Sequence, residues 1–275
     1  MKNSYVPVSP FRNIFCCCKS FTDNQCNKGR GRYTPDATTL CFSWGHSNNR
    51  TAGVDIDSVG NLWVVDSGNN RILRYPVGSK TANLLLGQAN FTNQGLGENS
   101  YGSGLNQLND PSAVRVNSQG RVYVADKNNN RVLVFDPPFT NGMNGKTFGS
   151  GFLAPTGVDF DPTEPGKIWI TDQGNTLIKL GYESSGQVVK QIGQIKNGNL
   201  LGFEVTGSLG IDSTGRVFVA TGGRSDYSSE ILVFEKSAPT DTPTKTFYWR
   251  LGNGITNDEL VGFGTGVGVA VANGQ

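Results

Sequence analysis

The chain has 275 residues, and its 24 lysines and arginines against 22 aspartates and glutamates leave a net charge of +2. This balance supplies no excess positive field for a polyanion, so the sequence does not favour nucleic acid as a partner. No apolar run reaches membrane-spanning length, which predicts no transmembrane segment, and the amino terminus lacks the apolar core of a signal peptide.

Residues 1–39 are expected to form an irregular leader, because they carry neither a strand pattern nor a helical one. All five cysteines lie in or just after this leader, as Cys16, Cys17, Cys18, Cys26 and Cys41. We interpret them as part of a poorly ordered segment. A bridge between Cys26 and Cys41, or acylation of the triplet, are the alternatives. Residues 40–275 are expected to form one domain.

Four copies of one short pattern follow along the chain, and a fifth begins at Gly268. The copies span residues 53–75, 113–135, 157–180 and 209–234. Their turn glycines lie 46 to 60 residues apart, which is the period of a propeller blade with variable loops. The repeat therefore predicts a modular fold before any single motif is considered.

Each copy contains three runs of alternating apolar residues, named strands A, B and C, which Gly, Asn and Asp separate. An aromatic residue recurs in strand B, at Trp63, Tyr123, Trp169 and Phe218. A fourth strand, D, is an apolar run that ends in glycine and a polar residue, as at Gln88. No helical pattern interrupts these runs. They predict an all-β fold, a β-propeller of four-stranded antiparallel blades.

The turn between strands B and C resembles that of NHL repeats, which form β-propellers, commonly with six blades. The match is close at residues 66–71 and 126–131, which read Asp-Ser-Gly-Asn-Asn-Arg and Asp-Lys-Asn-Asn-Asn-Arg. The third copy has no arginine after Asn175, and Thr221 replaces the aspartate in the fourth. Other segments are similar to secreted bacterial NHL-repeat proteins, a resemblance that implies a secreted or cell-surface location.

The order of the strands predicts an incomplete ring. The chain opens with a D strand near residues 40–45 and closes with an A strand near residues 267–272. Four complete blades lie between them, with partial ones at the ends. We therefore expect a fragment of a six-bladed ring that is incomplete at its carboxyl end, since closure of a ring hides unpaired strand edges.

The turn between strands B and C is expected to be architectural. Its repeated residues are Asp66, Arg71, Asp126, Arg131 and Asp172. Because they recur with the fold, stacking of the blades explains them better than a ligand does. We expect the aspartate to accept backbone hydrogen bonds and the guanidinium of the arginine to bridge neighbouring blades.

The connections from strand D to the next strand A form the predicted recognition surface, because loops vary while the blades hold them. The longest spans residues 89–111 and is expected to share one face with the B to C turns. The predicted binding residues on that face are Asn70, Asn90, Phe91, Tyr101, Asn130, Arg224 and Tyr227. A protein or glycan is the predicted partner. A solvated, mobile loop is the alternative.

Two carboxylates, Asp55 and Asp159, alternate with the apolar positions of strand A, where they would line a central channel. They suggest a metal-dependent hydrolase or lyase as one function. However, the two acids have no further ligands beside them in the sequence, and His46 is the sole histidine. We therefore expect no metal site, no cofactor and no catalytic residue. The favoured hypothesis is a non-enzymatic binding or scaffold propeller.

Overall fold

The computed structural model describes residues 53–91, 101–193, 195–196, 199–200, 209–222, 229–235 and 245–249. The cysteines, His46 and the end strands predicted near 40–45 and 267–272 lie outside these residues. Inside them the chain forms four antiparallel sheets of four strands each, so the predicted all-β fold with four blades is confirmed. This part of the chain contains no helix long and apolar enough to cross a membrane.

Each blade uses its strands in the order A, B, C, D from the inside outward. The first blade contains β1 (Val54–Ile56), β2 (Leu62–Asp66), β3 (Arg71–Tyr75) and β4 (Leu84–Leu86). The second contains β5 (Pro111–Val116), β6 (Val122–Asp126), β7 (Arg131–Phe135) and β8 (Lys146–Phe148). The third contains β9 (Pro155–Phe160), β10 (Lys167–Asp172), β11 (Leu177–Tyr182) and β12 (Val188–Ile192). The fourth contains β15 (Leu209–Ile211), β16 (Val217–Gly222), β17 (Ser229–Phe234) and β18 (Lys245–Trp249).

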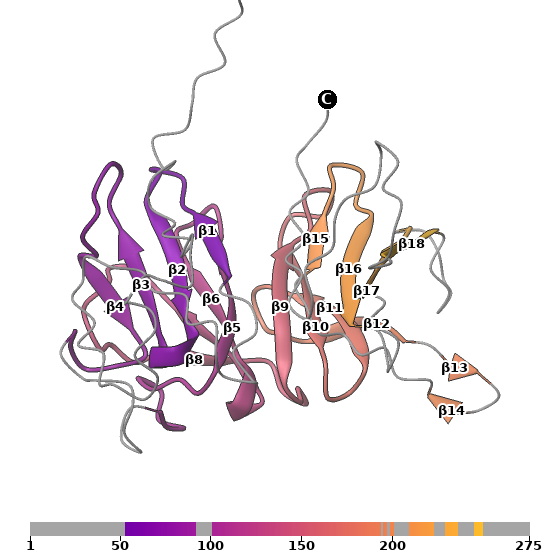
Figure 1. The fold of residues 1–275 in the computed structure, drawn as a ribbon, viewed down its shortest axis with the longest axis horizontal. Coiled ribbons are helices and arrows are strands. Elements are labelled where there is room, and N and C mark those ends of the chain that lie inside the picture. Colours follow the sequence, from indigo (N-terminus) through magenta and orange to yellow (C-terminus); the bar gives the residue numbers. More distant parts are fainter. Residues whose placement is uncertain are drawn as a thin grey trace, which may run out of the picture.

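The blades are arranged as in a propeller, with β1, β5, β9 and β15 toward the middle of the molecule and β4 and β18 toward its edges (Figure 1). One short hairpin that the sequence did not predict, β13 (Ile195–Lys196) with β14 (Asn199–Leu200), follows the third blade in the chain and precedes the fourth. The inner strands of successive blades contact one another, which brings residues about one repeat apart in sequence side by side.

The hydrophobic core lies between successive sheets. Trp63 of the first blade packs with residues of the second, and Trp169 of the third packs with residues of the fourth. Tyr123 belongs to the cluster that joins the second blade to the third. These three aromatic side chains of strand B are fully buried, and each contributes on the order of 2 kcal/mol through the hydrophobic effect. The recurring aromatic position therefore holds neighbouring blades together.

The turn between strands A and B is built around one acidic or amide side chain in every blade. The side-chain oxygen Oδ1 of Asp57, Asn117, Asp161 and Asp212 accepts backbone N–H groups of the residues that follow it. In two blades the other oxygen accepts the indole N–H of the strand B tryptophan, at 3.0 Å for Trp63 and 3.1 Å for Trp169. In these blades a hydrogen bond thus joins the aspartate of the A to B turn to the buried tryptophan of strand B.

The second blade departs from this rule at both positions together. Asn117 replaces the aspartate and Tyr123 replaces the tryptophan. The amide of Asn117 donates to Glu183 of the third blade, and the hydroxyl of Tyr123 donates to the same carboxylate at 3.0 Å. Burial, and then the carboxylate of Glu183, raise the pKa of Tyr123, which keeps its hydroxyl protonated as a donor. Here Asn117 still closes its own turn, and its amide together with the hydroxyl of Tyr123 also joins two blades.

Candidate functional site

One face of the propeller carries the B to C turns together with the D to A loops, and we call it the loop face. Two of these turns contain the short 3-10 segments η1 (Ser67–Asn69) and η2 (Lys127–Asn129). The side chain of Gln88, beyond β4, donates to the carbonyl of Asn69 in η1. Asn129 of η2 donates to the carbonyl of Gly102 at 2.7 Å. These contacts place the loops directly beside the turns.

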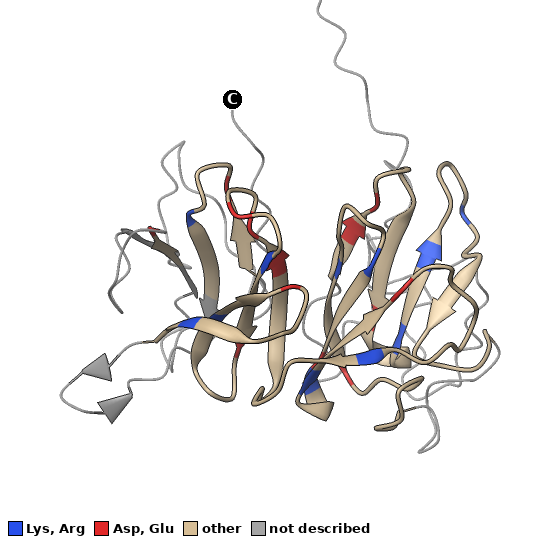
Figure 2. Cartoon of the chain, turned by 180° about the vertical axis from the view of Figure 1, so that it is seen from behind, with Lys and Arg blue, Asp and Glu red and all other residues tan. Residues whose placement is uncertain are grey.

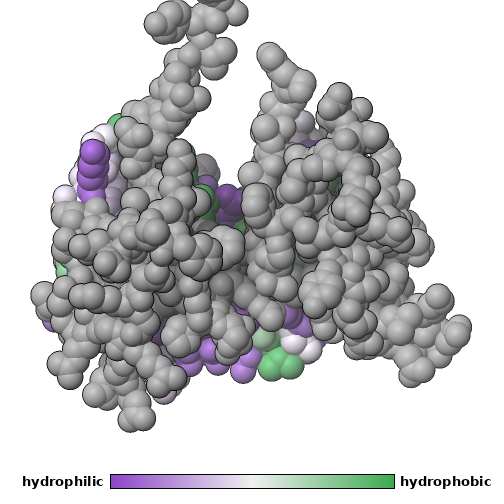
Figure 3. All heavy atoms as spheres, viewed as in Figure 1, coloured by the Kyte–Doolittle hydropathy of each residue, from purple (hydrophilic) through white to green (hydrophobic). Residues whose placement is uncertain are grey.

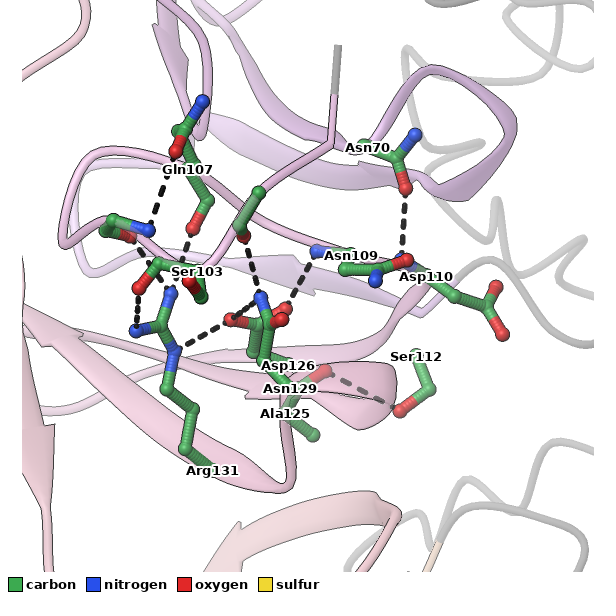
Figure 4. A network of polar contacts seen from close by, with 12 residues as sticks. Asn70, Ser103, Gln107, Asn109, Asp110, Ser112, Ala125, Asp126, Asn129 and Arg131 are labelled. Carbon is green, nitrogen blue, oxygen red and sulfur yellow. Dashed lines mark hydrogen bonds and ion pairs between the residues drawn. The ribbon is translucent and has the colours of Figure 1, made fainter. Parts of the chain in front are cut away.

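Arg131 holds the loop of residues 101–110 to the second blade (Figure 4). Its Nε lies 2.7 Å from Oδ2 of Asp126. The two Nη atoms donate to the carbonyl oxygens of Ser103, Gly104 and Gln107 at 2.7, 2.8 and 2.9 Å. Since a guanidinium presents its donors in a rigid plane, one side chain fixes several points of a loop that has no strand of its own.

Asp126 is the buried centre of this network. Its side chain is 0% exposed, and burial raises its pKa above the ordinary value. Hydrogen bonds from Asn129, from the backbone N–H of Asn109 and from Arg131 act in the opposite direction and stabilise the carboxylate. A buried carboxylate is tolerated only with such partners, so the loop and the turn depend on each other.

The first blade repeats the arrangement in part. Arg71, which is 2% exposed, lies 2.7 Å from Asp66 and donates to the carbonyl of Phe91 at 3.4 Å. We expected these arginines to bridge neighbouring blades. Arg71 and Arg131 each pair with the aspartate of their own blade and otherwise bind carbonyls of the D to A loops.

Asparagine side chains make the contact from one blade to the next. Asn70 and Asn130 both adopt the left-handed conformation, with φ of 54°. Oδ1 of Asn70 accepts the N–H of Asp110, and Oδ1 of Asn130 accepts the N–H of Ala154, both at 2.8 Å. Each acceptor belongs to one turn and each donor directly precedes strand A of the following blade. The side-chain oxygens of these two predicted binding residues therefore take part in the stacking of the blades.

The third blade replaces the arginine with Lys179, a residue that the sequence reasoning missed. Its Nζ lies 2.5 Å from Oδ2 of Asp172 and donates to the carbonyl of Gly151 at 2.7 Å. Asp172 also accepts the N–H of Leu153 at 2.7 Å. Leu177 occupies the register position of the arginine, and Lys179 lies two residues further along the same face of β11. The signal in the sequence is the period-two alternation of a strand, which puts residues two apart on the same face.

The other predicted binding residues have different surroundings. Asn90 and Tyr101 are exposed, and the side chain of Tyr101 is 47% exposed. Phe91 is partly buried against the core of the first blade. Arg224 and Tyr227 lie outside the described residues. Of the seven residues, the structure places Asn70, Tyr101 and Asn130 at or beside the turns of the loop face.

A second group of polar residues lies on the inner strands. Arg115 of β5 sits between the two predicted channel carboxylates, with Nη1 3.3 Å from Asp55 of β1 and Nε 3.4 Å from Asp159 of β9. Asp55 also accepts the N–H of Val116 at 2.7 Å. The three charged side chains link three successive blades across the inner strands.

Burial and the neighbouring Arg115 act on the pKa of Asp159 in opposite directions. Burial raises the pKa of Asp159 to about 6, although the charge of Arg115 acts to lower it. The guanidinium occupies the space between the two acids that a cation would need, and it neutralises one of their charges. The part of the chain that the structure describes contains no group of three or more His, Cys, Asp or Glu residues arranged to hold a metal.

Residues of both charges and of both polarities occur in the described part of the chain (Figure 2 and Figure 3). Segments with Lys or Arg and segments with Asp or Glu occur on both halves of the described ribbon (Figure 2). At the hollow in the middle of the molecule, hydrophilic and hydrophobic atoms lie next to one another (Figure 3).

Comparison with known proteins supports this architecture. Residues 108–135 match the NHL repeat family. The chain is similar to hydrazine synthase of Kuenenia stuttgartiensis, with 11% identity and a TM-score of 0.51 over 76% of this chain and 52% of that one. It is also similar to virginiamycin B lyase of Staphylococcus aureus, with 13% identity and a TM-score of 0.46 over 74% of this chain and 56% of that one.

At these identities the likeness concerns the fold alone. The chain spans little more than half the length of the two solved structures. Comparison with curated protein sequences gives no match.

Proposed function

Because an NHL repeat lies within a β-propeller, we propose that the protein is a non-enzymatic binding or scaffold propeller. In this proposal the loop face is presented to a protein or glycan partner. We further propose that residues 40–275 form one propeller domain behind a leader of residues 1–39. A secreted or cell-surface location rests on the resemblance to secreted bacterial NHL-repeat proteins.

One observation carries the proposal: the long loop of the predicted recognition surface is fixed where the structure describes it. Residues 101–110 are tied to the second blade through Arg131, Asn129 and Asp126. A loop held in one conformation loses little entropy when it binds, which is the physical advantage of a rigid scaffold. For residues 101–110 this supports recognition over the alternative of a solvated, mobile connection.

The alternative of a metal-dependent hydrolase or lyase depends on Asp55 and Asp159. Arg115 lies between them and competes with a divalent cation for the same oxygens. A cation would have to displace a guanidinium that carries hydrogen bonds and charge. The geometry therefore supports a structural role for these carboxylates, in which they join three inner strands.

The test is a binding survey of the purified full chain. We expect the chain to retain displayed peptides or immobilised oligosaccharides, and we expect chelation with EDTA to leave that binding unchanged. Metal analysis of the same preparation separates the two functions. A stoichiometric divalent cation that is lost when Asp55 and Asp159 are replaced by asparagine would contradict the proposal and support the enzyme.

A further inference from the structure

The loop between β7 and β8 of the second blade reaches back to the first blade, and we call its residues 136–145 the clasp loop. Oδ1 of Asn141 accepts the N–H of Leu85 at 3.0 Å, and the N–H of Gly142 donates to the carbonyl of Leu85 at 3.4 Å. Leu85 lies in β4, the outermost strand of the first sheet. The clasp loop therefore occupies a strand edge that the sheet itself leaves unpaired.

The Asn-Gly pair of the clasp loop is fixed by close packing. The N–H of Met143 donates to the carbonyl of Thr140 at 3.3 Å, which makes Asn141 and Gly142 the two central residues of a turn. Gly142 has a φ of 68°, and a β-carbon there would lie 2.9 Å from Cα of Ala89. This position therefore requires glycine, both for its conformation and for its closeness to the first blade.

Asparagine followed by glycine can react with itself, because glycine has no β-carbon to block the approach of its nitrogen to the preceding side chain. The main-chain nitrogen of Gly142 bonds to Cγ of Asn141 and closes a succinimide ring. The bond from Cγ to the side-chain nitrogen breaks, and that nitrogen leaves as ammonia with the proton that Gly142 gives up. Water then opens the ring. Opening at Cγ gives aspartate, and opening at the main-chain carbonyl gives isoaspartate.

The contacts of the clasp loop favour this reaction at Asn141. The N–H of Leu85 can only donate, so the side chain turns its oxygen toward β4. A donor at Oδ1 stabilises the negative charge that this oxygen acquires when Cγ is attacked, as in an oxyanion hole. The nucleophile is weakly protected, because the hydrogen bond from Gly142 is long at 3.4 Å. Asn141 is exposed, so water reaches its amide.

A second Asn-Gly pair in the same loop provides an internal comparison. Asn144 is exposed, as Asn141 is. Gly145, however, is buried, and its N–H donates to the carbonyl of Leu105 at 2.8 Å. The two pairs have the same sequence, but the nitrogen that would attack is better protected in the second pair.

We infer that Asn141 is a site of spontaneous deamidation through a succinimide, and that isoaspartate formed there loosens the contact of the clasp loop with β4. Isoaspartate adds a carbon to the main chain between residues 141 and 142, and the packing of Gly142 on Ala89 leaves no room for that shift. Aspartate keeps the original main chain and can accept the N–H of Leu85 in place of the amide oxygen. The inference is independent of the proposed binding function.

The first experiment keeps the full chain in mildly alkaline buffer, either folded or in concentrated urea, and follows each asparagine by peptide mapping with mass spectrometry. In the folded chain we expect Asn141 to convert about tenfold faster than Asn144, because the two nucleophiles differ by about one good hydrogen bond. In urea we expect comparable rates, since the unfolded chain presents the same pair of residues twice. Equal rates in the folded chain, or a faster reaction at Asn144, would overturn the inference.

The second experiment tests the effect on the clasp loop. Anion exchange separates aged chains by their added negative charge, and the fraction modified at residue 141 alone is compared with Asn141→Asp by urea unfolding. We expect Asn141→Asp to match the original chain and the aged fraction, which contains isoaspartate, to unfold at a lower urea concentration. Equal midpoints for the two would overturn the loosening of the clasp loop.

Asn141→Gln is the matched control, because its side chain is one methylene too long to close the succinimide ring. We expect this variant to lose the conversion at residue 141 and to keep the rate at Asn144. Conversion at residue 141 that continues at the original rate would overturn the succinimide route.

Discussion

Lys179 Nζ lies 2.5 Å from Oδ2 of Asp172, and a lysine thereby neutralises in the third blade the carboxylate that an arginine neutralises in the first two. The side chain of Asp172 is fully buried and that of Lys179 almost so. The turn of the third blade therefore keeps a cation paired with its aspartate, although its sequence departs from the NHL-like pattern. The requirement is a cation within reach of the aspartate, and two positions on one strand face can supply it.

Replacing this cation should destabilise the fold strongly. Lys179→Met is expected to lower the free energy of unfolding by about 3 to 5 kcal/mol, because it leaves a buried carboxylate without its partner. Urea unfolding measures the change. The control is Lys146→Met, since Lys146 pairs with Asp136 but is 76% exposed, and we expect a loss under about 1 kcal/mol. Equal losses in the two variants would show that the pair in the third blade contributes nothing special.

The stability of the protein should depend on pH through Asp159. Burial raises its pKa to about 6 from the ordinary value of 3.8, so between these values the folded state holds a proton that the unfolded chain has released. The free energy of unfolding therefore decreases as pH rises through this window, by at most about 3 kcal/mol. Asp159→Asn is expected to remove most of this decrease. Urea unfolding at several pH values between 3.5 and 7 provides the measurement; these pH limits bracket the two values.

Asp212 changes stability with pH in the opposite direction to Asp159, and it does so at lower pH. The effects of the two residues on stability can therefore be measured separately. Burial acts to raise its pKa, but hydrogen bonds from Thr214 and Arg216 outweigh it and lower the pKa to about 2. Its stabilising contribution is present above 3.8 and is lost as pH falls toward 2. An Asp159→Asn variant whose pH profile matches the original chain between 3.8 and 6 would contradict the assignment to Asp159.

Asn130 allows its structural role to be separated from a role in binding. Asn130→Ala removes the acceptor for the N–H of Ala154 and leaves a residue that tolerates the left-handed conformation less well than asparagine, which together should cost about 2 kcal/mol. Asn130→Gly relieves the backbone cost and should lose only about half as much. Urea unfolding of both variants measures the difference. Two variants as stable as the original chain would show that the contact between blades is dispensable.

The exchange of Asp for Asn in the second blade yields a further prediction. Asn117 donates an amide hydrogen to Glu183, so Asn117→Asp would put two carboxylates against each other. We expect a loss of about 1 to 3 kcal/mol at pH 7, from the missing donor and the repulsion. Part of this loss should return near pH 4, where one carboxyl is protonated. The control is Ser118→Asp, at an exposed position of the same turn, which is expected to change stability little. Unfolding at both pH values is the measurement.

The sequence by itself determined the blade. Alternation of apolar residues, the aromatic position of strand B and the turn glycines predicted the four strands of each copy, because strand period and turn conformation are local properties of the chain. Gly60, Gly120, Gly166 and Gly215 all adopt positive φ in the A to B turns, which glycine reaches without strain. The position of Asp55 and Asp159 on the inner strands follows from the same alternation.

Only the tertiary structure decided which polar groups meet. Arg115 lies about one repeat from each of Asp55 and Asp159 in sequence, and stacking of the blades brings all three together. The same stacking pairs Asn130 with Ala154 and Tyr123 with Glu183. A repeat pattern specifies each unit but not the side chains that the next unit presents to it, since those contacts depend on the spacing and rotation of whole sheets.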